Sequence, residues 1–378
     1  MILAEEHELV RATARAFAEK ALAPHAATWE QERAVPRAVL REMGALGLMG
    51  MTVPPEWGGA GADYVAYALA LIEVAAGNGA VSTIMSGHNS VGCMPILENG
   101  TQSQKDRWLR PLARGEQLCA FCLTEPQGGS DAGAVKTRAV RSNDGWRIDG
   151  VKQFITSGST AELALVFAVT DPAAGKRGLS AFLVPTVTPG YRVGRIERKM
   201  GQSASDTCEI VLDGVEVSTD ALLGAEGAGY RIALSNLEGG RIGIAAQAVG
   251  MARAALDRAV AYAKERVTFG KPIAAHQAVG FRLADMATKV AAAEQLVLHA
   301  AALRSAGRPC LKEASMAKLF ATEAAEEVCR NAIQTLGGNG YMADYEVERI
   351  YRDVRGALIY EGTNDIQRLV IGRALTGH

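Results

Sequence analysis

The sequence predicts an α+β protein with an N-terminal helical domain, a central antiparallel β barrel or sandwich, and a C-terminal helical bundle. Three observations support this order. Apolar residues recur at three and four positions over 1–116, short β-rich runs fill 117–222, and the helical period returns over 223–378. A chain of 378 residues is long enough for two or three packed domains.

The first domain, residues 1–116, is predicted to be almost entirely helical. Its helical stretches are "EEHELVRATARAFAEKAL", "PRAVLREMGALGLMG", "YVAYALALIEVAAG" and "SQKDRWLRPLARG". Pro36 suits the first turn of a helix, where no backbone N–H is needed. "PPEWGGAGA" at 54–62 interrupts this pattern, because proline and glycine disfavour a regular helix.

The middle domain, residues 117–222, is predicted to be built from short strands without a long helix between them. That pattern favours an antiparallel barrel or sandwich over a doubly wound sheet. Cys119 and Cys122 form a C-x-x-C within the strand "QLCAFCLT", where residues three apart point to opposite faces. Because no second pair completes a zinc site, we interpret the six scattered cysteines as reduced thiols.

The last domain, residues 223–378, contains three long alanine-rich helical stretches. They are "IGIAAQAVGMARAALDRAVAYAKERV", "VGFRLADMATKVAAAEQLVLHAAALRSA" and "LKEASMAKLFATEAAEEVCRNAIQTLGG". Helices of this length suit an antiparallel bundle, here a four-helix bundle.

Composition narrows the class of protein. Hydrophobic residues make up 48% and charged residues 21%, which is typical of a soluble globular protein. The net charge of −1 argues against a broad nucleic-acid-binding surface. No apolar run approaches the roughly 20 residues that a membrane span needs. The first 20 residues mix both charge signs and lack the features of a signal or transit peptide, so we expect a cytoplasmic protein.

Several glycine-rich segments are candidates for a cofactor site. No G-x-G-x-x-G follows a strand and opens a helix, so a Rossmann site is unsupported. "LTEPQGGSDAG" at 123–133 leaves a strand and offers backbone amides and the hydroxyls of Thr124 and Ser130 to a flat ring or a phosphate. Any glycine-rich turn has these properties. "LGGNGY" at 336–341 could equally end a helix, and an arginine such as Arg266 is usually solvated.

Glu361 stands out in "LIYEGTNDIQ", between an apolar triplet and a turn. A charge beside apolar residues is disfavoured unless it is paired or its pKa rises. From the local sequence alone, Glu361 is either a surface carboxylate near a helix that Thr363 caps, or a buried functional group.

Taken together, these segments resemble the acyl-CoA dehydrogenases. The resemblance rests on "CAFCLTEPQGGSDAG", "KQFITSG", "RKMGQSASDTCEIVLDGVEV", "ERVTFGKPI", "QTLGGNGY" and "YEGTNDIQ", which occur in the order and spacing of that family. The likeness spans nearly the whole chain, and the family's fold is the α–β–α arrangement predicted above.

The resemblance implies an FAD site and assigns residues to it. The isoalloxazine ring would lie against Phe121, Leu123, Thr124, Gly129, Ser130, Phe154, Ile155 and Thr156. A neighbouring subunit's FAD would be held by Arg266, Thr268, Phe269, Gln277, Gln334, Gly337 and Gly338. Thr363 and Asp365 would contact the FAD of their own subunit near the pyrophosphate. Two positions depart from the family, since Phe154 replaces a common tryptophan and Asp365 a common amide.

The resemblance also implies the chemistry. The family removes a proton from Cα of an acyl-CoA and a hydride from Cβ, and Glu361 matches the general base. Ser130, Glu238, Arg241 and Gly362 match positions that contact the substrate. Some members carry the base on another helix, at the position that is Gly240 here, so that alternative is closed. His88, in a helix expected near the acyl pocket, is more often a core residue than a functional one.

The implied activity is the dehydrogenation of a short-chain acyl-CoA, unbranched or with one methyl branch, with electrons passed to an electron-transfer flavoprotein. The cross-subunit site implies a homotetramer, a dimer of dimers. Alternative functions on the same fold are those of a flavin oxidase or monooxygenase, an acyl-carrier-protein thioester dehydrogenase, and a non-catalytic nucleic-acid-binding relative. Oxidases are typically longer than this chain, and the nucleic-acid-binding type is expected to carry a basic extension.

Overall fold

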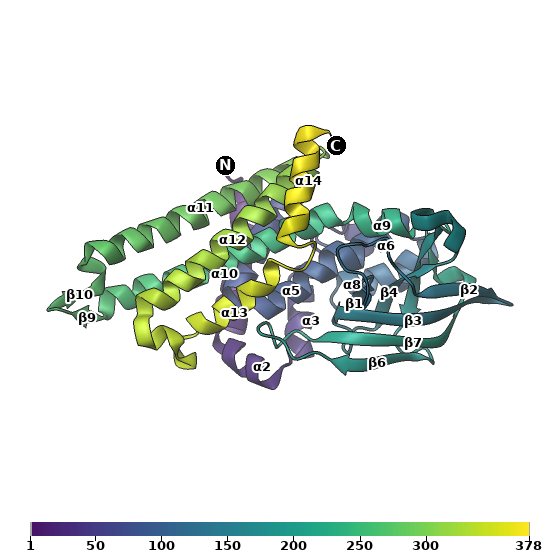
Figure 1. Cartoon of the computed structure of the whole chain (residues 1–378), viewed down its shortest axis with the longest axis horizontal. Coiled ribbons are helices and arrows are strands. Elements are labelled where there is room, and N and C mark those ends of the chain that lie inside the picture. Colours follow the sequence, from purple (N-terminus) through teal and green to yellow (C-terminus); the bar gives the residue numbers. More distant parts are fainter. Residues whose placement is uncertain (1, 378) are drawn as a thin grey trace.

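The computed structural model describes residues 2–377 and has the predicted helix–sheet–helix order (Figure 1). The N-terminal helices pack behind the C-terminal bundle, and the sheet lies to one side of both (Figure 1). The first domain contains α1 (Glu5–Phe17), α2 (Ala26–Glu32), α3 (Arg37–Ala45), α4 (Tyr64–Gly77), α5 (Gly79–Gly87), α6 (Met94–Asn99), α7 (Gln102–Gln104) and α8 (Arg110–Ala113). Pro36 is the N-cap of α3 rather than part of its first turn.

The middle domain is an eight-stranded sheet within residues 2–377. Its strands are β1 (Cys119–Cys122), β2 (Arg138–Ser142), β3 (Gly145–Thr156), β4 (Leu163–Val169), β5 (Leu179–Pro185), β6 (Tyr191–Ile196), β7 (Thr207–Ser218) and β8 (Leu222–Leu223). The order of hydrogen-bonded strands across the sheet is β6-β7-β3-β2-β4-β5-β8, and β1 lies outside this order and pairs with β4. Most neighbours are antiparallel, as expected, while β1 pairs β4 in parallel and β2 touches β4 in parallel at one position.

The C-terminal domain is built around three long helices. It contains α9 (Gly229–Ser235), α10 (Leu237–Glu265), α11 (Gln277–Ser305), α12 (Leu311–Leu336), α13 (Val347–Ala357) and α14 (Asn364–Thr376). A short hairpin, β9 (Val267–Thr268) and β10 (Lys271–Pro272), joins α10 to α11 at the far end of the bundle (Figure 1). Small alanines line the buried face of α10, which lets α12 and α4 approach it closely.

One continuous core joins the two helical domains and one face of the sheet, and a second core lies under its other face. The C-x-x-C pair illustrates the division. Cys119 belongs to the second core and Cys122 to the first, so the two side chains lie on opposite faces of β1 as predicted. All six cysteines are buried and free.

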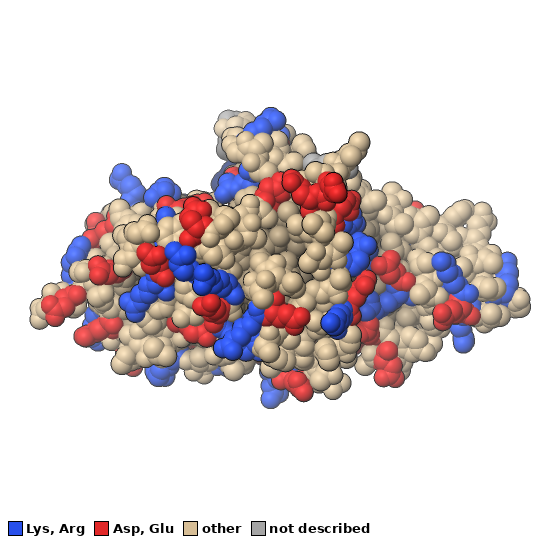
Figure 2. Space-filling view, turned by 180° about the vertical axis from the view of Figure 1, so that it is seen from behind, with Lys and Arg blue, Asp and Glu red and all other residues tan. Residues whose placement is uncertain are grey.

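The surface of residues 2–377 carries interspersed charge. On the face shown in Figure 2, Lys and Arg side chains lie among Asp and Glu side chains. Among the helices of residues 2–377, none combines the length and the hydropathy that crossing a bilayer would require.

Candidate active site

Glu361 lies in the short turn between α13 and α14. Thr363 caps α14, since its Oγ1 accepts a hydrogen bond from the Ile366 amide at 3.4 Å. Glu361 and Gly362, near the end of the turn, both have left-handed backbone, with φ of +55° and +85°. A glycine adopts this conformation freely, but a glutamate does so only when its surroundings hold it there.

Side chains from two helices hold this turn. Gln367 of α14 donates from Nε2 to the carbonyl oxygens of Glu361 at 3.3 Å and Gly362 at 2.8 Å. Lys318 of α12 donates from Nζ to the Gly362 oxygen at 3.0 Å and to Oδ1 of Asn364 at 2.8 Å. The carbonyls that the turn leaves unpaired are therefore satisfied from inside the protein.

The carboxylate of Glu361 lies against α10 at Gly240. A Cβ atom at position 240 would lie 2.7 Å from Oε2 of Glu361, closer than such atoms approach in proteins. Glycine is therefore needed there for the carboxylate to take this position. A side chain at position 240 would occupy the same space as the Glu361 carboxylate, so this site has room for a carboxylate from one of the two positions.

The environment of this carboxylate favours its protonated form. Burial raises the pKa of Glu361 to about 7, and the positive charges of Arg241 and Lys318 act in the opposite direction. The phenol groups of Tyr67 and Tyr360 lie near enough for the Glu361 charge to raise their pKa values, to which their own burial contributes most. A carboxylate with a pKa near neutrality can both accept and hold a proton.

Tyr360, the residue before Glu361, belongs to a closed ring of hydrogen bonds. Its hydroxyl donates to Oε1 of Gln247 at 2.7 Å and accepts from Nε2 of Gln202 at 2.9 Å. Nε2 of Gln247 donates to Thr83 at 2.6 Å, and the Thr83 hydroxyl donates to Oε1 of Gln202 at 2.5 Å. Local sequence did not predict this ring, because its members lie on segments far apart in the chain.

Gln202 also attaches the β domain to the segment that carries the base. It lies in the loop between β6 and β7, its backbone amide donates to Asp353 of α13, and its Nε2 donates to the Asp353 carbonyl at 2.9 Å. The same loop binds the end of β3, where the Ser157 amide donates to the Asp206 carbonyl at 3.3 Å. The end of β3 and the Glu361 segment are therefore fixed to one loop.

The expected flavin-binding residues at β1 and β3 form one group. The Gln153 amide donates to the Thr124 carbonyl at 2.9 Å, which ties the two segments together. Phe154 is 60% exposed with a φ of +58°, so an aromatic face is presented to solvent. The hydroxyls of Thr124 and Thr156 make no hydrogen bond within residues 2–377. Free donors beside an exposed aromatic ring fit the polar edge and the flat face of an isoalloxazine.

The rest of this group follows the same segments. Phe121 packs edge-to-face on Phe167, with ring centroids 4.9 Å apart, and Ile155 is buried. Leu123 is partly buried, while Gly129 and Ser130 are exposed in the loop after β1. This loop therefore presents backbone and hydroxyl groups on the surface.

A buried ion pair anchors that loop. Lys152 and Glu125, which are 0% and 4% exposed, approach to 2.7 Å. Glu125 also accepts from the amides of Lys136 at 2.7 Å and Thr137 at 3.0 Å, which lie at the other end of the loop. These contacts lower the pKa of Glu125 to about 2 against the opposing effect of burial.

The second expected group lies at the far end of the bundle, away from β1 and β3 (Figure 1). It comprises Arg266, Thr268, Phe269, Gln277, Gln334, Gly337 and Gly338. Phe269 is 95% exposed at the hairpin tip, with a φ of +50°. The loop that carries Gly337 and Gly338 reaches α10 through Asn339, which donates to the Tyr262 hydroxyl at 3.0 Å. Within a single chain, this group and the flavin group are not brought together.

The expected substrate contacts have different surroundings. Arg241 is 5% exposed, and its Nε makes no hydrogen bond within residues 2–377. Glu238 is bound to Arg304 at 3.1 Å and is partly exposed. The Asp365 side chain is exposed at the start of α14 and lies 3.8 Å from Arg368. Of these residues, only Arg241 is a buried charge with an unused donor.

His88 behaves as a core residue. It is 2% exposed, and its Nε2 lies 2.9 Å from the Leu112 carbonyl, while Nδ1 has no partner within residues 2–377. Burial lowers the His88 pKa to about 4. The imidazole is therefore neutral at physiological pH.

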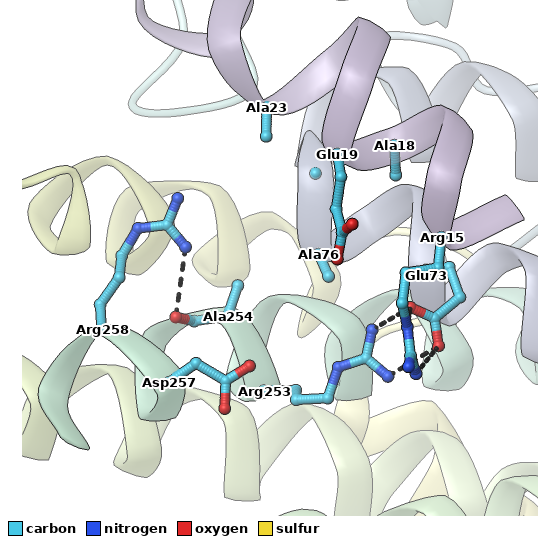
Figure 3. A pocket seen from close by; sticks show the side chains of 11 residues that line it. Arg15, Ala18, Glu19, Ala23, Glu73, Ala76, Arg253, Ala254, Asp257 and Arg258 are labelled. Carbon is cyan, nitrogen blue, oxygen red and sulfur yellow. Dashed lines mark hydrogen bonds and ion pairs between the residues drawn. The ribbon is translucent and has the colours of Figure 1, made fainter. Parts of the chain in front are cut away.

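A cleft of about 390 Å³ lies elsewhere, between α1, α4 and α10. Figure 3 shows Arg15 and Arg253 pointing at the carboxylate of Glu73. Their distances to Glu73 are 3.0 and 2.5 Å, and Arg11 joins them at 3.2 Å. Because these ion pairs satisfy its buried carboxylate, the cleft is lined by a structural cluster and lacks the features of the Glu361 site.

Comparison with known protein families matches three domains along the chain. The acyl-CoA dehydrogenase N-terminal domain covers residues 4–116, the middle domain 120–215 and the C-terminal domain 227–376. An acyl-CoA dehydrogenase of Bacillus subtilis is 50% identical over the full length of both chains. The mitochondrial short-chain specific acyl-CoA dehydrogenase of Bos taurus is 47% identical, covering 98% of this chain and 90% of its own.

Solved structures show the same likeness. Butyryl-CoA dehydrogenase from Megasphaera elsdenii superposes with a TM-score of 0.97 at 40% identity, covering 99% of each chain. A chain from a structure of a study on the electron transferring flavoprotein of Acidaminococcus fermentans gives a TM-score of 0.98 at 43% identity, with full coverage of both chains. Glutaryl-CoA dehydrogenase from Mycobacterium smegmatis, in complex with FADH2, gives 0.95 at 35% identity and covers all of this chain and 96% of its own.

Proposed function

The chain belongs to the acyl-CoA dehydrogenase family, and we propose that it dehydrogenates short-chain acyl-CoA thioesters with Glu361 as the general base. As a member of this family, it is an FAD-dependent oxidoreductase that acts on the CH–CH bond of an acyl-CoA. The observation that carries the proposal is the carboxylate of Glu361, on a partly buried side chain that lies against Gly240, with its pKa raised by burial to about 7.

In the proposed reaction, an Oε atom of Glu361 accepts the proton from the substrate's α-carbon. The α-proton of a thioester is weakly acidic, so a desolvated carboxylate is a better base than a solvated one. The Glu361 amide makes no hydrogen bond within residues 2–377, so it is free to donate to the thioester carbonyl as negative charge develops. FAD, when bound, supplies the acceptor for the hydride from the β-carbon.

We assign FAD binding to the expected residues in two larger groups, and to Thr363 and Asp365 at the start of α14. The β1 and β3 group offers the free hydroxyls of Thr124 and Thr156 and the exposed Phe154 ring. Arg266 and Phe269, at the far end of the bundle, would serve the FAD of a partner subunit, which accounts for their exposure. This arrangement requires at least a dimer, and we propose a dimer of dimers.

The CoA part of the substrate is assigned to Arg241 and Glu238, and further substrate contacts are assigned to Gly362 and Ser130. Arg241 offers its unused Nε–H from a buried position, where a charge-assisted hydrogen bond is strong. Ser130 and Gly362 present hydroxyl and backbone groups at the surface of the site. Glu238 already accepts from Arg304, so substrate binding would add to an existing ion pair.

The short-chain preference rests on similarity and on the packing of the expected pocket helix. The relatives described above include a short-chain specific enzyme and a butyryl-CoA dehydrogenase. Met85, His88 and Met94 are the bulky side chains of this helix that could limit the depth of the pocket; Met85 and His88 are buried, and Met94 is partly buried. A single side chain shifts the preferred length, because each methylene changes discrimination by about 1–3 kcal/mol. Branched short chains fall in the same range of sizes.

An electron-transfer flavoprotein is proposed as the electron acceptor, supported by the likeness to the Acidaminococcus fermentans chain.

The test measures kcat/KM of the FAD-loaded enzyme over a series of saturated acyl-CoAs with that acceptor, for the wild type and for Glu361→Gln. We expect an optimum at about four carbons. We also expect Glu361→Gln to bind butyryl-CoA while flavin bleaching slows by several orders of magnitude. A Glu361→Gln variant that bleaches at the wild-type rate would refute the base assignment. An optimum at long chains, or turnover only of carrier-protein thioesters, would refute the proposed substrate.

A further inference from the structure

Lys318 is an internal cation that the proposed mechanism does not use. Its side chain is 0% exposed on α12, and a buried ammonium group is costly unless its donors are satisfied. Both of its hydrogen bonds go to the turn that carries the base, to the Gly362 carbonyl at 3.0 Å and to Oδ1 of Asn364 at 2.8 Å. This cation therefore serves the Glu361 turn directly.

The neighbours of Lys318 complete a rigid support. Thr322, one helical turn further along α12, lies 3.1 Å from Nδ2 of Asn364 and also donates to the Lys318 carbonyl at 2.8 Å. Gln367 of α14, itself 0% exposed, gives the Gly362 carbonyl its second donor. Hydrogen bonds from both α12 and α14 therefore hold the turn in place, which explains how Glu361 keeps its left-handed backbone.

The charges around the pair are few. The charged groups that act on Glu361 or Lys318, besides each other, are Arg241 from α10 and Glu323 from α12. The Glu361 charge in turn acts on the phenols of Tyr67 from α4 and Tyr360 beside the base. Burial lowers the pKa of Lys318 to about 8, while the Glu361 carboxylate favours its charged form. In return, Lys318 and Arg241 lower the pKa of Glu361 against the larger effect of burial.

We propose that Lys318 is a positioning residue for the base: it fixes the turn that aims Glu361 and supplies a positive charge that favours the carboxylate. This inference rests on the proposed function, because it assumes that Glu361 takes the substrate's proton. It adds that the reactivity of Glu361 is set from α12 as well as from α10. Without the ammonium group, the carboxylate would bind its proton more tightly and its turn would lose two hydrogen bonds.

The test isolates proton transfer from oxidation. Acetyl-CoA has α-hydrogens but no β-carbon, so the FAD-loaded enzyme can exchange its α-protons with D2O but cannot oxidise it. In this exchange, Glu361 takes a proton as the C–H bond breaks, and the carbanion equivalent is quenched by a deuteron from solvent. The exchange rate is followed by mass spectrometry from pD 5.5 to 9, for the wild type and for Lys318→Met.

We expect the acid limb of the Lys318→Met profile to lie about one pH unit above that of the wild type. The exchange rate at pD 6 should fall about tenfold, because below its pKa the ionised fraction of the base falls about tenfold when that pKa rises by one unit. Lys318→Arg should restore the position of the limb, since it keeps the charge. The matched control is Lys312→Met on the same helix, whose partly exposed lysine pairs with its neighbour Glu313 at 3.1 Å, and it should leave the profile unchanged.

Because Lys318→Met could fail to fold, a second variant is measured. Lys318→Gln removes the charge but keeps a hydrogen-bond donor for the turn. Flavin absorbance and circular dichroism establish that each variant is folded and loaded. Coincident limbs for the wild type and Lys318→Gln would overturn the proposal, whether or not Lys318→Met folds. Glu361→Gln distinguishes failure of the base assignment from failure of the role of Lys318. If Glu361→Gln exchanges as fast as the wild type, the base assignment fails. If Glu361→Gln is inactive and the acid limb of the Lys318→Gln profile coincides with that of the wild type, only the role of Lys318 fails.

Discussion

The hydroxyl of Tyr360 donates a 2.7 Å hydrogen bond to the side-chain oxygen of Gln247, which lies 113 positions earlier in the chain. The same hydroxyl accepts from Gln202, so one phenol joins α10, the β6–β7 loop and the Glu361 segment. The backbone next to Glu361 is therefore fixed by hydrogen bonds to both the helical bundle and the β domain.

Replacing Tyr360 with Phe should weaken both stability and catalysis. Oε1 of Gln247 would lose its donor in a buried position, which costs about 1–3 kcal/mol. We expect a lower Tm and a kcat reduced about tenfold, with KM changed less, because a misaligned base acts on bound substrate. Tyr230→Phe is the control, since its hydroxyl makes no hydrogen bond within residues 2–377. Equal kcat values for Tyr360→Phe and wild type would show that the ring does not position Glu361.

Gly240→Ala should displace the base while leaving the fold intact. The added Cβ would meet the Glu361 carboxylate at 2.7 Å, so the side chain must move. A misplacement of about 1 Å can lower the rate by roughly 100-fold, and we expect flavin bleaching by butyryl-CoA to slow by that order. Gly372→Ala on α14 is the matched control, because a Cβ there meets nothing within 4 Å. Unchanged bleaching in Gly240→Ala would mean that Glu361 reacts from another position.

Glu361→Gln should be at least as stable as the wild type at pH 8. The folded state raises the pKa of this carboxyl to about 7, so the native protein binds the proton more tightly than the unfolded chain does. The charged side chain therefore destabilises the fold increasingly as pH rises from about 4 to about 7, by at most about 3 kcal/mol. Gln removes this penalty. Thermal unfolding at pH 8 and pH 4.5 tests it, with exposed Glu42→Gln as control; a lower Tm for Glu361→Gln at pH 8 would contradict the expectation.

Arg266→Ala should lose FAD and weaken assembly if this residue serves a partner's cofactor. Losing one charge-assisted hydrogen bond costs about 1.5–3 kcal/mol, which corresponds to FAD binding about 10–100 times weaker. Flavin fluorescence after dilution measures the release, and light scattering measures the mass. Arg192→Ala, an exposed arginine on the sheet, should change neither. A stable, FAD-replete monomer of the wild-type chain would rule out the cross-subunit site.

Local patterns were sufficient to predict the order of domains, the Thr363 cap and the opposite faces of Cys119 and Cys122. Each of these follows from a period or a cap within a few residues. The parallel pairing of β1 with β4 was not predictable in this way, because strands 40 residues apart leave no turn signal between them.

The support of the site was not predictable either. Gln202 reaches Tyr360 across 158 positions, and Lys318 reaches Gly362 across 44. Such contacts depend on how helices and loops pack, and a lone glutamine in a loop or a lone lysine in a helical pattern looks like a solvated residue. The left-handed backbone at Glu361 had only the following glycine as a local sign.

The convergence of Arg11, Arg15 and Arg253 on Glu73 has a consequence for the newly made chain. Glu73 is 2% exposed, and the partner that approaches it most closely, at 2.5 Å, is Arg253, which leaves the ribosome 180 residues later. Until then Glu73 can pair with Arg11 and Arg15 of the first domain but lacks its ion pair with Arg253, so its buried carboxylate is less well satisfied. The N-terminal helices therefore reach their final stability only after α10 has emerged, and the first and last domains complete their folding together.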